Sequence, residues 1–181
     1  MNRQPTLEGE RLLLRPLRGD DRDALFAVAS DPLVWEVHPA HDRWQEGVFR
    51  TFFADALAKG GALVVIDKAS GAIVGSSRFQ NHCEEGDGSV EIGWTFLARS
   101  HWGGSYNREM KRLMLAHALA TVERVHFIVG EDNHRSRGAM IKIGGVLDDW
   151  AEAREMAGGP VRHVRFSIDR ADFANGPLSR A

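Results

Sequence analysis

One stretch of the chain, residues 89–119, constrains its fold more than any other. Large apolar side chains occupy every second position at its start, and this period of two predicts a half-buried β-strand: Val90, Ile92, Trp94 and Phe96. Residues 102–106 then read Trp-Gly-Gly-Ser-Tyr, and the two adjacent glycines let the backbone turn tightly. From Met110 onward the apolar side chains recur at helical spacing. The stretch therefore predicts a strand, a glycine turn and a helix in immediate succession.

The turn in this stretch is suited to an anion. It aims the free N–H groups and the positive dipole end of the helix at the space beyond the strand, where a phosphate is stabilised. Asn107 is a suitable N-cap, and Glu109 in the first turn complements the dipole. The glycine spacing matches neither a dinucleotide fingerprint nor a P-loop. A Gly-Gly pair by itself is more typical of a plain strand-to-helix turn, so the turn alone fixes no ligand.

The chain before this stretch contains two helices and three strands. The pattern predicts, in order, a strand at 11–17, a helix from Asp20 or Asp21 to the Asp31-Pro32 pair, a helix with apolar positions from Trp44 to Leu57, and a hairpin of strands at 62–66 and 72–80. The irregular loop between the two helices carries Trp35. This side chain could contact a substrate under a closing loop, or it could pack the two helices together.

The chain after this stretch completes the sheet. An apolar strand at 125–129 should lie parallel to the strand that carries Glu91, because a helix crossover joins them. A helix should follow from Asn133 or His134, and then two closing strands at 146–154 and 161–168. We expect one α/β domain over residues 1–181, with a mixed, mostly antiparallel sheet of six to seven strands and about four helices. The segment 169–181 should be a loosely held tail.

Composition excludes several classes of partner. The formal net charge is −2, so neither a nucleic-acid surface nor an anionic-membrane surface is indicated. The chain has one cysteine, Cys83, which rules out a disulfide within the chain and fits a reducing compartment. No apolar run reaches membrane-spanning length, and the N-terminus lacks a secretory apolar segment. We expect a cytoplasmic protein.

Three ordered motifs resemble a known family. The first is the opening from Thr6 to Pro16 with the acidic pair that follows it; the second runs from Glu91-Ile92-Gly93-Trp94 through Trp102-Gly103 and Tyr106 to Glu109; the third is the series Asn133, Ser136, Ala139, Lys142 and Gly144. Together they resemble the GNAT N-acetyltransferases, particularly the RimJ/RimL-like branch that acetylates the N-termini of ribosomal proteins. The resemblance covers about residues 6–144.

The resemblance implies a GNAT fold whose two central parallel strands splay apart and hold acetyl-CoA. It places the pantetheine arm between Thr95-Phe96-Leu97 and the end of the strand at 125–129, where a backbone N–H near Phe96 or Leu97 polarises the thioester. The family's phosphate loop usually reads Gln/Arg-x-x-Gly-x-Gly/Ala. This chain has Trp102, Ser105 and Asn107 at those positions, together with Gly103, Gly104 and Tyr106 in the same loop.

The resemblance also implies residues for the chemistry. Asn133 would hold the pantetheine and Ser136 would face the sulfur, although both residue types also favour helix caps. Glu91 lies on the strand face opposite Val90 and is a candidate general base for an amine, or else an ordinary carboxylate paired with an arginine. The acceptor would be a protein N-terminus or a small-molecule amine, and the protein a monomer or a homodimer.

The remaining polar residues point to no other chemistry. The eight histidines form no metal-ligand or triad-like pattern, and no metal is needed. Acidic residues in loops would attract a cationic amine or are simply solvated: Glu84, Glu85, Asp87, Glu131, Asp132, Asp148 and Asp149. Two alternatives remain for the whole chain. One is a catalytically inactive GNAT-like sensor of acyl-CoA or of a partner, and the other is a nucleotide-binding domain with an all-parallel sheet.

Overall fold

A single mixed sheet forms the centre of the protein. The computed structural model describes residues 1–84 and 88–179, and in this part of the chain eight strands follow the order β1-β2-β3-β4-β5-β6-β8-β7. The strands are β1 Leu7–Glu8, β2 Leu12–Pro16, β3 Ala62–Asp67, β4 Ile73–Cys83, β5 Ser89–Leu97, β6 Arg124–Gly130, β7 Val146–Met156 and β8 Gly159–Asp169. All neighbouring strands are antiparallel except β5 and β6. The prediction of six to seven strands missed the two-residue β1, and an all-parallel sheet is excluded.

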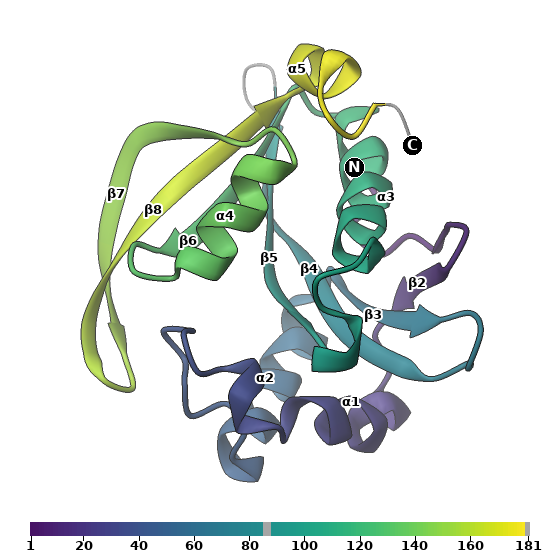
Figure 1. Cartoon of the computed structure of the whole chain (residues 1–181), viewed down its shortest axis with the longest axis vertical. Coiled ribbons are helices and arrows are strands. Elements are labelled where there is room, and N and C mark those ends of the chain that lie inside the picture. Colours follow the sequence, from purple (N-terminus) through teal and green to yellow (C-terminus); the bar gives the residue numbers. More distant parts are fainter. Residues whose placement is uncertain (85–87, 180–181) are drawn as a thin grey trace.

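Helices cover both faces of the sheet (Figure 1). They are α1 Arg22–Ala29, α2 Glu46–Lys59, α3 Tyr106–Leu119, α4 His134–Lys142 and the short α5 Arg170–Asn175, with 3-10 turns η1 Gly19–Asp21, η2 Pro32–Val34 and η3 Arg99–His101. One apolar core lies between the sheet and helices α3 and α4, and a second lies between the sheet and helices α1 and α2. The amphipathic patterns that predicted these helices are therefore the faces that fill the two cores.

The strands β5 and β6 pair for only three residues. The pairs are Ser89 with Arg124, Val90 with Val125, and Glu91 with His126, although both strands continue well past these positions. Figure 1 shows the two strands close together near α5 and diverging toward α1 and α2. The predicted splay between the two central parallel strands is thus confirmed. We call the point just past Glu91 and His126 the fork.

A β-bulge changes which face the end of β5 presents. The partner of Gly93 is Arg78 but the partner of Phe96 is Ser76, so β5 has one residue more than β4 between these pairs. Trp94 takes up the extra residue with φ 51°, a conformation that side-chain-bearing residues rarely adopt. The strict period of two is therefore wrong beyond Ile92. Ile92 packs in the α3–α4 core, whereas Phe96 packs in the α1–α2 core.

A buried carboxylate fixes helix α3 to the edge of the sheet. Oε1 of Glu109, which is buried, accepts hydrogen bonds from the backbone N–H groups of Arg11 (2.9 Å) and Leu12 (3.2 Å). The helix begins at Tyr106, with Ser105 as an N-cap that makes no side-chain capping bond. The prediction of Asn107 as N-cap is therefore wrong, because Asn107 already lies in the first turn. The Glu109 carboxylate therefore complements the positive end of the helix dipole and also accepts the hydrogen bonds from the start of β2.

The C-terminal segment is held more firmly than the sequence suggests. Residues 170–175 form α5, and Leu178 is almost fully buried in the core shared with α3 and α4. The guanidinium of Arg108 on α3 donates to the backbone oxygen of Pro177. The described part of the predicted loose tail thus packs on the domain, because one apolar side chain finds a place in the core.

Replacing Glu109 by alanine should lower the free energy of unfolding by about 3 kcal/mol, because two backbone N–H groups lose a charged acceptor. Urea denaturation measures this change. The control is Glu10→Ala, one residue before Arg11, whose side chain is 81% exposed and which should change stability by less than about 0.5 kcal/mol. Equal losses in the two variants would show that Glu109 does not anchor β2.

Candidate active site

A buried carboxylate lies at the fork. The Glu91 residue is only 5% exposed, and its Oε2 accepts a hydrogen bond from Nδ2 of Asn81 at 2.7 Å. Burial raises the pKa of this carboxyl group, while the bond from Asn81 and the charge of Arg154 act in the opposite direction. No ion pair to Glu91 is found among the described residues. A carboxyl group with a raised pKa is a suitable proton acceptor near neutral pH.

The bulge brings Trp94 to the same face as Glu91. Val90 and Ile92 point into the α3–α4 core, so Glu91 between them points to the α2 side. The ring of Trp94 lies 4.9 Å from the guanidinium of Arg78, which binds α2. The sequence pattern had put Trp94 opposite Glu91, and the bulge is the reason for the difference.

His126 is a site residue that the sequence pattern gave no reason to choose. It is the register partner of Glu91 in β6, and neighbouring strands point registered side chains to the same face. Its Nδ1 lies 2.9 Å from Oγ of Ser167, and burial lowers the pKa of the imidazole. Only the pairing of β5 with β6 could reveal it, because neither its spacing nor its neighbours in sequence are unusual.

A pocket of about 580 Å³ opens beside Trp94 on the α2 side. It is lined by Ala40, Arg43, Gly47, Val48, Thr51, Phe52, Asp55 and Trp94. The Arg43 guanidinium lies 4.4 Å from the ring centre of Phe52 and 5.0 Å from that of Trp35. Burial lowers the pKa of Arg43 to about 10, so it remains a cation at neutral pH. The pocket therefore has aromatic walls and a charged rim.

The wall behind this pocket carries an incompletely paired arginine. Arg78 is 1% exposed, and its Nη1 donates to Oδ2 of Asp55 (2.9 Å) and to Oε1 of Gln80 (3.0 Å). Its Nε and Nη2 are buried without a hydrogen-bond partner among the described residues. Asp55 is also shared with Lys59 at 2.9 Å. The Arg78 guanidinium therefore keeps donor capacity that Asp55 and Gln80 do not use.

Trp35 lies in the core and not in an open site. It is 1% exposed, its Nε1 donates to the backbone oxygen of Ala29 at 2.7 Å, and its ring lies 5.0 Å from that of Phe96. Of the two roles that the sequence left open, the structure has the packing one. The loop beyond Trp35 reaches the far side of the fork, where Pro39 leaves no room for a side chain at Gly130.

On the α3 side of the fork, the structure places a buried amine. Lys111 is 2% exposed; its Nζ donates to Oγ1 of Thr95 on β5 at 2.8 Å and lies 5.3 Å from the ring centre of Phe127 on β6. Thr95 Oγ1 also lies 2.8 Å from Oγ of Ser77. Thr95 therefore faces α3, away from Glu91. Burial lowers the pKa of Lys111 to about 7.

The loop between β5 and α3 presents backbone N–H groups and cations. Gly103 has φ 71°, in the left-handed region that favours glycine, and its Cβ direction is open. The first N–H groups of α3 have no acceptor within the helix. Arg11 donates a hydrogen bond to Oγ of Ser105. The Trp102 indole donates to the backbone oxygen of Leu97 at 2.9 Å and stacks 4.1 Å from the Arg135 guanidinium.

The start of α4 shows Asn133 in the capping role, and its predicted contact with pantetheine stays a prediction. Oδ1 of Asn133 accepts a bond from the backbone N–H of Ser136 at 3.0 Å, so this buried side chain caps the helix. The Ser136 side chain is half-buried. Because Asn133 provides the cap, the Ser136 hydroxyl is not needed for that purpose.

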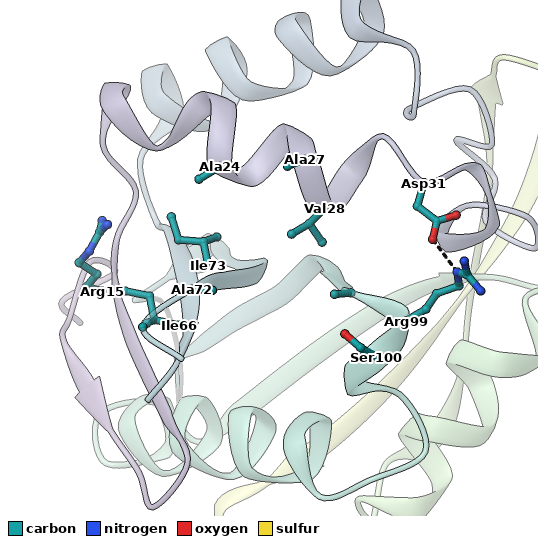
Figure 2. A pocket seen from close by; sticks show the side chains of 12 residues that line it. Arg15, Ala24, Ala27, Val28, Asp31, Ile66, Ala72, Ile73, Arg99 and Ser100 are labelled. Atoms are coloured by element: carbon teal, nitrogen blue, oxygen red, sulfur yellow. Dashed lines mark hydrogen bonds and ion pairs between the residues drawn. The ribbon is translucent and has the colours of Figure 1, made fainter. Parts of the chain in front are cut away.

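A larger cavity lies on the α1 side, and residues 98–100 just past the end of β5 form part of its lining. It has a volume of about 940 Å³ and lies between α1 and the β3–β4 hairpin (Figure 2). Small apolar side chains such as Ala24, Val28 and Ile73 line it, and the ion pair between Asp31 and Arg99 (2.5 Å) lies at one end. It contains none of the predicted site residues.

Two of the acidic loop residues are paired with arginines. Glu131 lies 3.4 Å from Arg162, and Asp148 lies 2.7 Å from Arg165. Glu85 and Asp87 lie outside the described residues. In the described ranges, no three His, Cys, Asp or Glu side chains are grouped so that they could hold a metal ion, and no helix is long and apolar enough to cross a membrane.

Comparison with known families agrees with the splayed sheet. The model of the Acetyltransferase (GNAT) domain matches residues 11–146. The chain belongs to the GNAT acetyltransferase family. Its fold, a mixed sheet with helices on both faces, is the α/β fold of that family.

Three relatives illustrate the breadth of this GNAT family. The chain is 26% identical to an uncharacterized N-acetyltransferase, p20, from Bacillus licheniformis, over 93% of this chain and 98% of that one. The structure of Mycobacterium smegmatis RimJ in complex with CoA-disulfide matches 97% of this chain and 92% of its own at 18% identity, with a TM-score of 0.75. Vibrio cholerae spermidine N-acetyltransferase, in complex with CoA and spermine, matches 92% and 100% at 16% identity, with a TM-score of 0.71. At these identities the two structures establish a shared fold and no shared acceptor.

The raised pKa of Glu91 should make stability depend on pH. The folded state holds this proton more tightly than the unfolded state, so the stability that it contributes is lost as pH rises from roughly 4.3, the unfolded value, through the folded pKa. Glu91→Gln removes this dependence. The unfolding free energy of the variant minus that of the wild type should therefore increase with pH and level off above the folded pKa. Urea titrations at a series of pH values measure it, and a constant difference would contradict the assignment.

Proposed function

We propose that this protein is an acetyl-CoA-dependent N-acetyltransferase in which a primary amine attacks the acetyl group directly. The observation that carries the proposal is the buried carboxyl group of Glu91, with its raised pKa, at the point where β5 and β6 separate. A general base in this position needs no ion-pair partner and can accept a proton from an amine, directly or through water.

The residues around the fork fit acetyl-CoA. Beyond Glu91 and His126, backbone groups of β5 and β6 face each other without strand pairing, and the amides of a pantetheine arm can take their hydrogen bonds. The segment Thr95-Phe96-Leu97 lines this gap. At its mouth, Gly103, Gly104 and the first N–H groups of α3 suit a diphosphate, with Arg11 nearby. Ser105 and Asn107 replace the small residues usual in the family, and Ser105 bonds to Arg11 instead.

Two side chains of the chain serve the reaction in this proposal. Acetyl-CoA supplies an acetyl thioester, whose carbonyl carbon forms the new bond to the amine. Glu91 accepts the proton that the amine must lose. Ser136, which Asn133 leaves free of the helix cap, faces the sulfur and donates a hydrogen bond to it. The raised pKa of Glu91 suits it to this step, because a carboxylate with an ordinary pKa is a weaker base.

We also propose that the acceptor carries an anionic group close to its amine. Arg43 and Arg78 lie on the same side of β5 as Glu91, and Nε and Nη2 of Arg78 have no acceptor among the described residues. In register, Arg78 lies two strand positions from Glu91, which is about 7 Å. A peptide N-terminus with an acidic second residue has about this spacing between its amine and its carboxylate. A polyamine would meet like charge.

The reaction is tested by measuring CoA release from acetyl-CoA with a panel of amines. Glu91→Gln should lower kcat/KM by about 100-fold, the typical contribution of a general base. The loss should widen as pH rises through the raised pKa of Glu91, because the wild-type carboxyl group ionises over this range and glutamine does not. Binding of acetyl-CoA without turnover of any amine would instead indicate a sensor.

The acceptor class is tested with two short peptides that differ only in the charge of their second residue, Ala-Asp-amide and Ala-Lys-amide, and with spermidine. The wild type should prefer the aspartyl peptide by about tenfold in kcat/KM, which corresponds to about 1.4 kcal/mol. Arg43→Met should abolish the preference and leave the rate with the lysyl peptide nearly unchanged. The matched control is Arg50→Met, which replaces an exposed arginine on α2 and should keep the preference. Spermidine as the best acceptor would refute this assignment.

A further inference from the structure

A lysine that the sequence pattern did not single out lies inside the gap between β5 and β6. We propose that Lys111 is a catalytic acid that gives its proton to the departing sulfur of CoA. This inference rests on the proposed function, because it takes the gap to be the place of the acyl donor. It assigns to Lys111 the proton and to Ser136 the hydrogen bond that holds the sulfur in position.

The contacts of Lys111 place its nitrogen between the diverging strands. Nζ donates to Oγ1 of Thr95, which lies beyond the bulge on β5, and lies 5.3 Å from the ring of Phe127, the first β6 residue past the last strand pair. The amine thus contacts both strands past the fork. In the proposed function the diphosphate binds the loop before α3, so the arm of an acyl donor anchored there enters the space between the two strands and passes Lys111.

Besides its bond to Thr95, Nζ of Lys111 contacts the Phe127 ring, but these contacts leave N–H donors of the amine unused. A buried amine costs free energy unless it is fully hydrogen-bonded, and only one hydrogen bond from Nζ is found within the described residues. Thr95 keeps its contact with Ser77 in any case. An apolar side chain of the same length would fill this space at lower cost. The remaining donor capacity of Nζ therefore points to a ligand.

With Glu91 and Lys111 on opposite faces of the fork, each proton that moves in the reaction has a donor and an acceptor. The amine nitrogen forms a bond to the acetyl carbon, the carbon–sulfur bond breaks, and its electron pair stays on sulfur. Glu91 takes one proton from the amine, and the Lys111 ammonium gives one proton to sulfur. Exchange with solvent then restores both side chains. Because the pKa of Lys111 is about 7 and that of a thiol is about 8.5, the transfer of a proton from the Lys111 ammonium to the sulfur is favourable.

The test compares Lys111→Met, which keeps the length of the side chain and removes the amine, with Arg112→Met on the same helix as control. Affinities for CoA and for desulfo-CoA are measured together with kcat, KM and the unfolding free energy. In the wild type, CoA should bind about 25-fold more tightly than desulfo-CoA, because Lys111 and Ser136 each donate a hydrogen bond to sulfur that is worth about fivefold. In Lys111→Met this ratio should fall to about fivefold, the part that Ser136 supplies, kcat should fall by about 100-fold, and KM for acetyl-CoA should change by less than about threefold.

Stability separates this role from a packing role. Lys111→Met should be at least as stable as the wild type, because a buried amine has been removed, whereas loss of a packing residue would lower stability. A second variant provides the test if the Lys111→Met protein does not fold. Thr95→Val removes the partner of Nζ but keeps the lysine, and it should lower kcat by about tenfold. An unchanged CoA to desulfo-CoA ratio, or an unchanged kcat, overturns the assignment of Lys111 alone. A wild type that binds neither ligand overturns the proposed function with it.

Discussion

The separation of β5 from β6 after three residue pairs is the constraint on which the rest of the structure depends. Adjacent parallel strands normally continue their hydrogen bonds, because unpaired backbone groups are costly inside a protein. Here the bulge at Trp94 bends β5 at the point where pairing would continue. On β6, Pro39 packs against Gly130 and Lys111 packs against Phe127. The gap is therefore built into the fold from both sides.

The bulge also decides which side chains meet. Without it, Thr95 would share a face with Glu91, and Trp94 would point into the α3–α4 core. With it, Thr95 reaches Lys111, and Trp94 forms a wall beside Arg78. One extra residue in β5 thus divides the site into two chemically different sides. The α2 side holds a carboxyl group and arginines, and the α3 side holds an amine and a hydroxyl.

This division makes sense of three ionisable groups that are costly to bury. Glu91, Lys111 and Arg78 are each at most 5% exposed, and none has all of its hydrogen-bonding capacity used. A protein that needed only stability would replace them with apolar side chains. Their concentration around one gap is the pattern expected where burial adjusts pKa values for a reaction. The charged groups that line the larger cavity between α1 and the β3–β4 hairpin are in ion pairs, Arg15 with Asp21 and Arg99 with Asp31.

The sequence by itself determined the order of the main helices and strands, the parallel pairing after a helix crossover and the apolar faces of the helices. Apolar periodicity and glycine positions are local properties, so they can be read without coordinates. It also indicated Glu91, since its motif and its strand position are local too. Only the tertiary structure decided the face of Trp94, the burial of Trp35 and Leu178, and the meeting of Lys111 with Thr95 and of His126 with Glu91. A bulge shifts the period of two by one residue, and contacts between distant segments depend on register and packing, which no local pattern encodes.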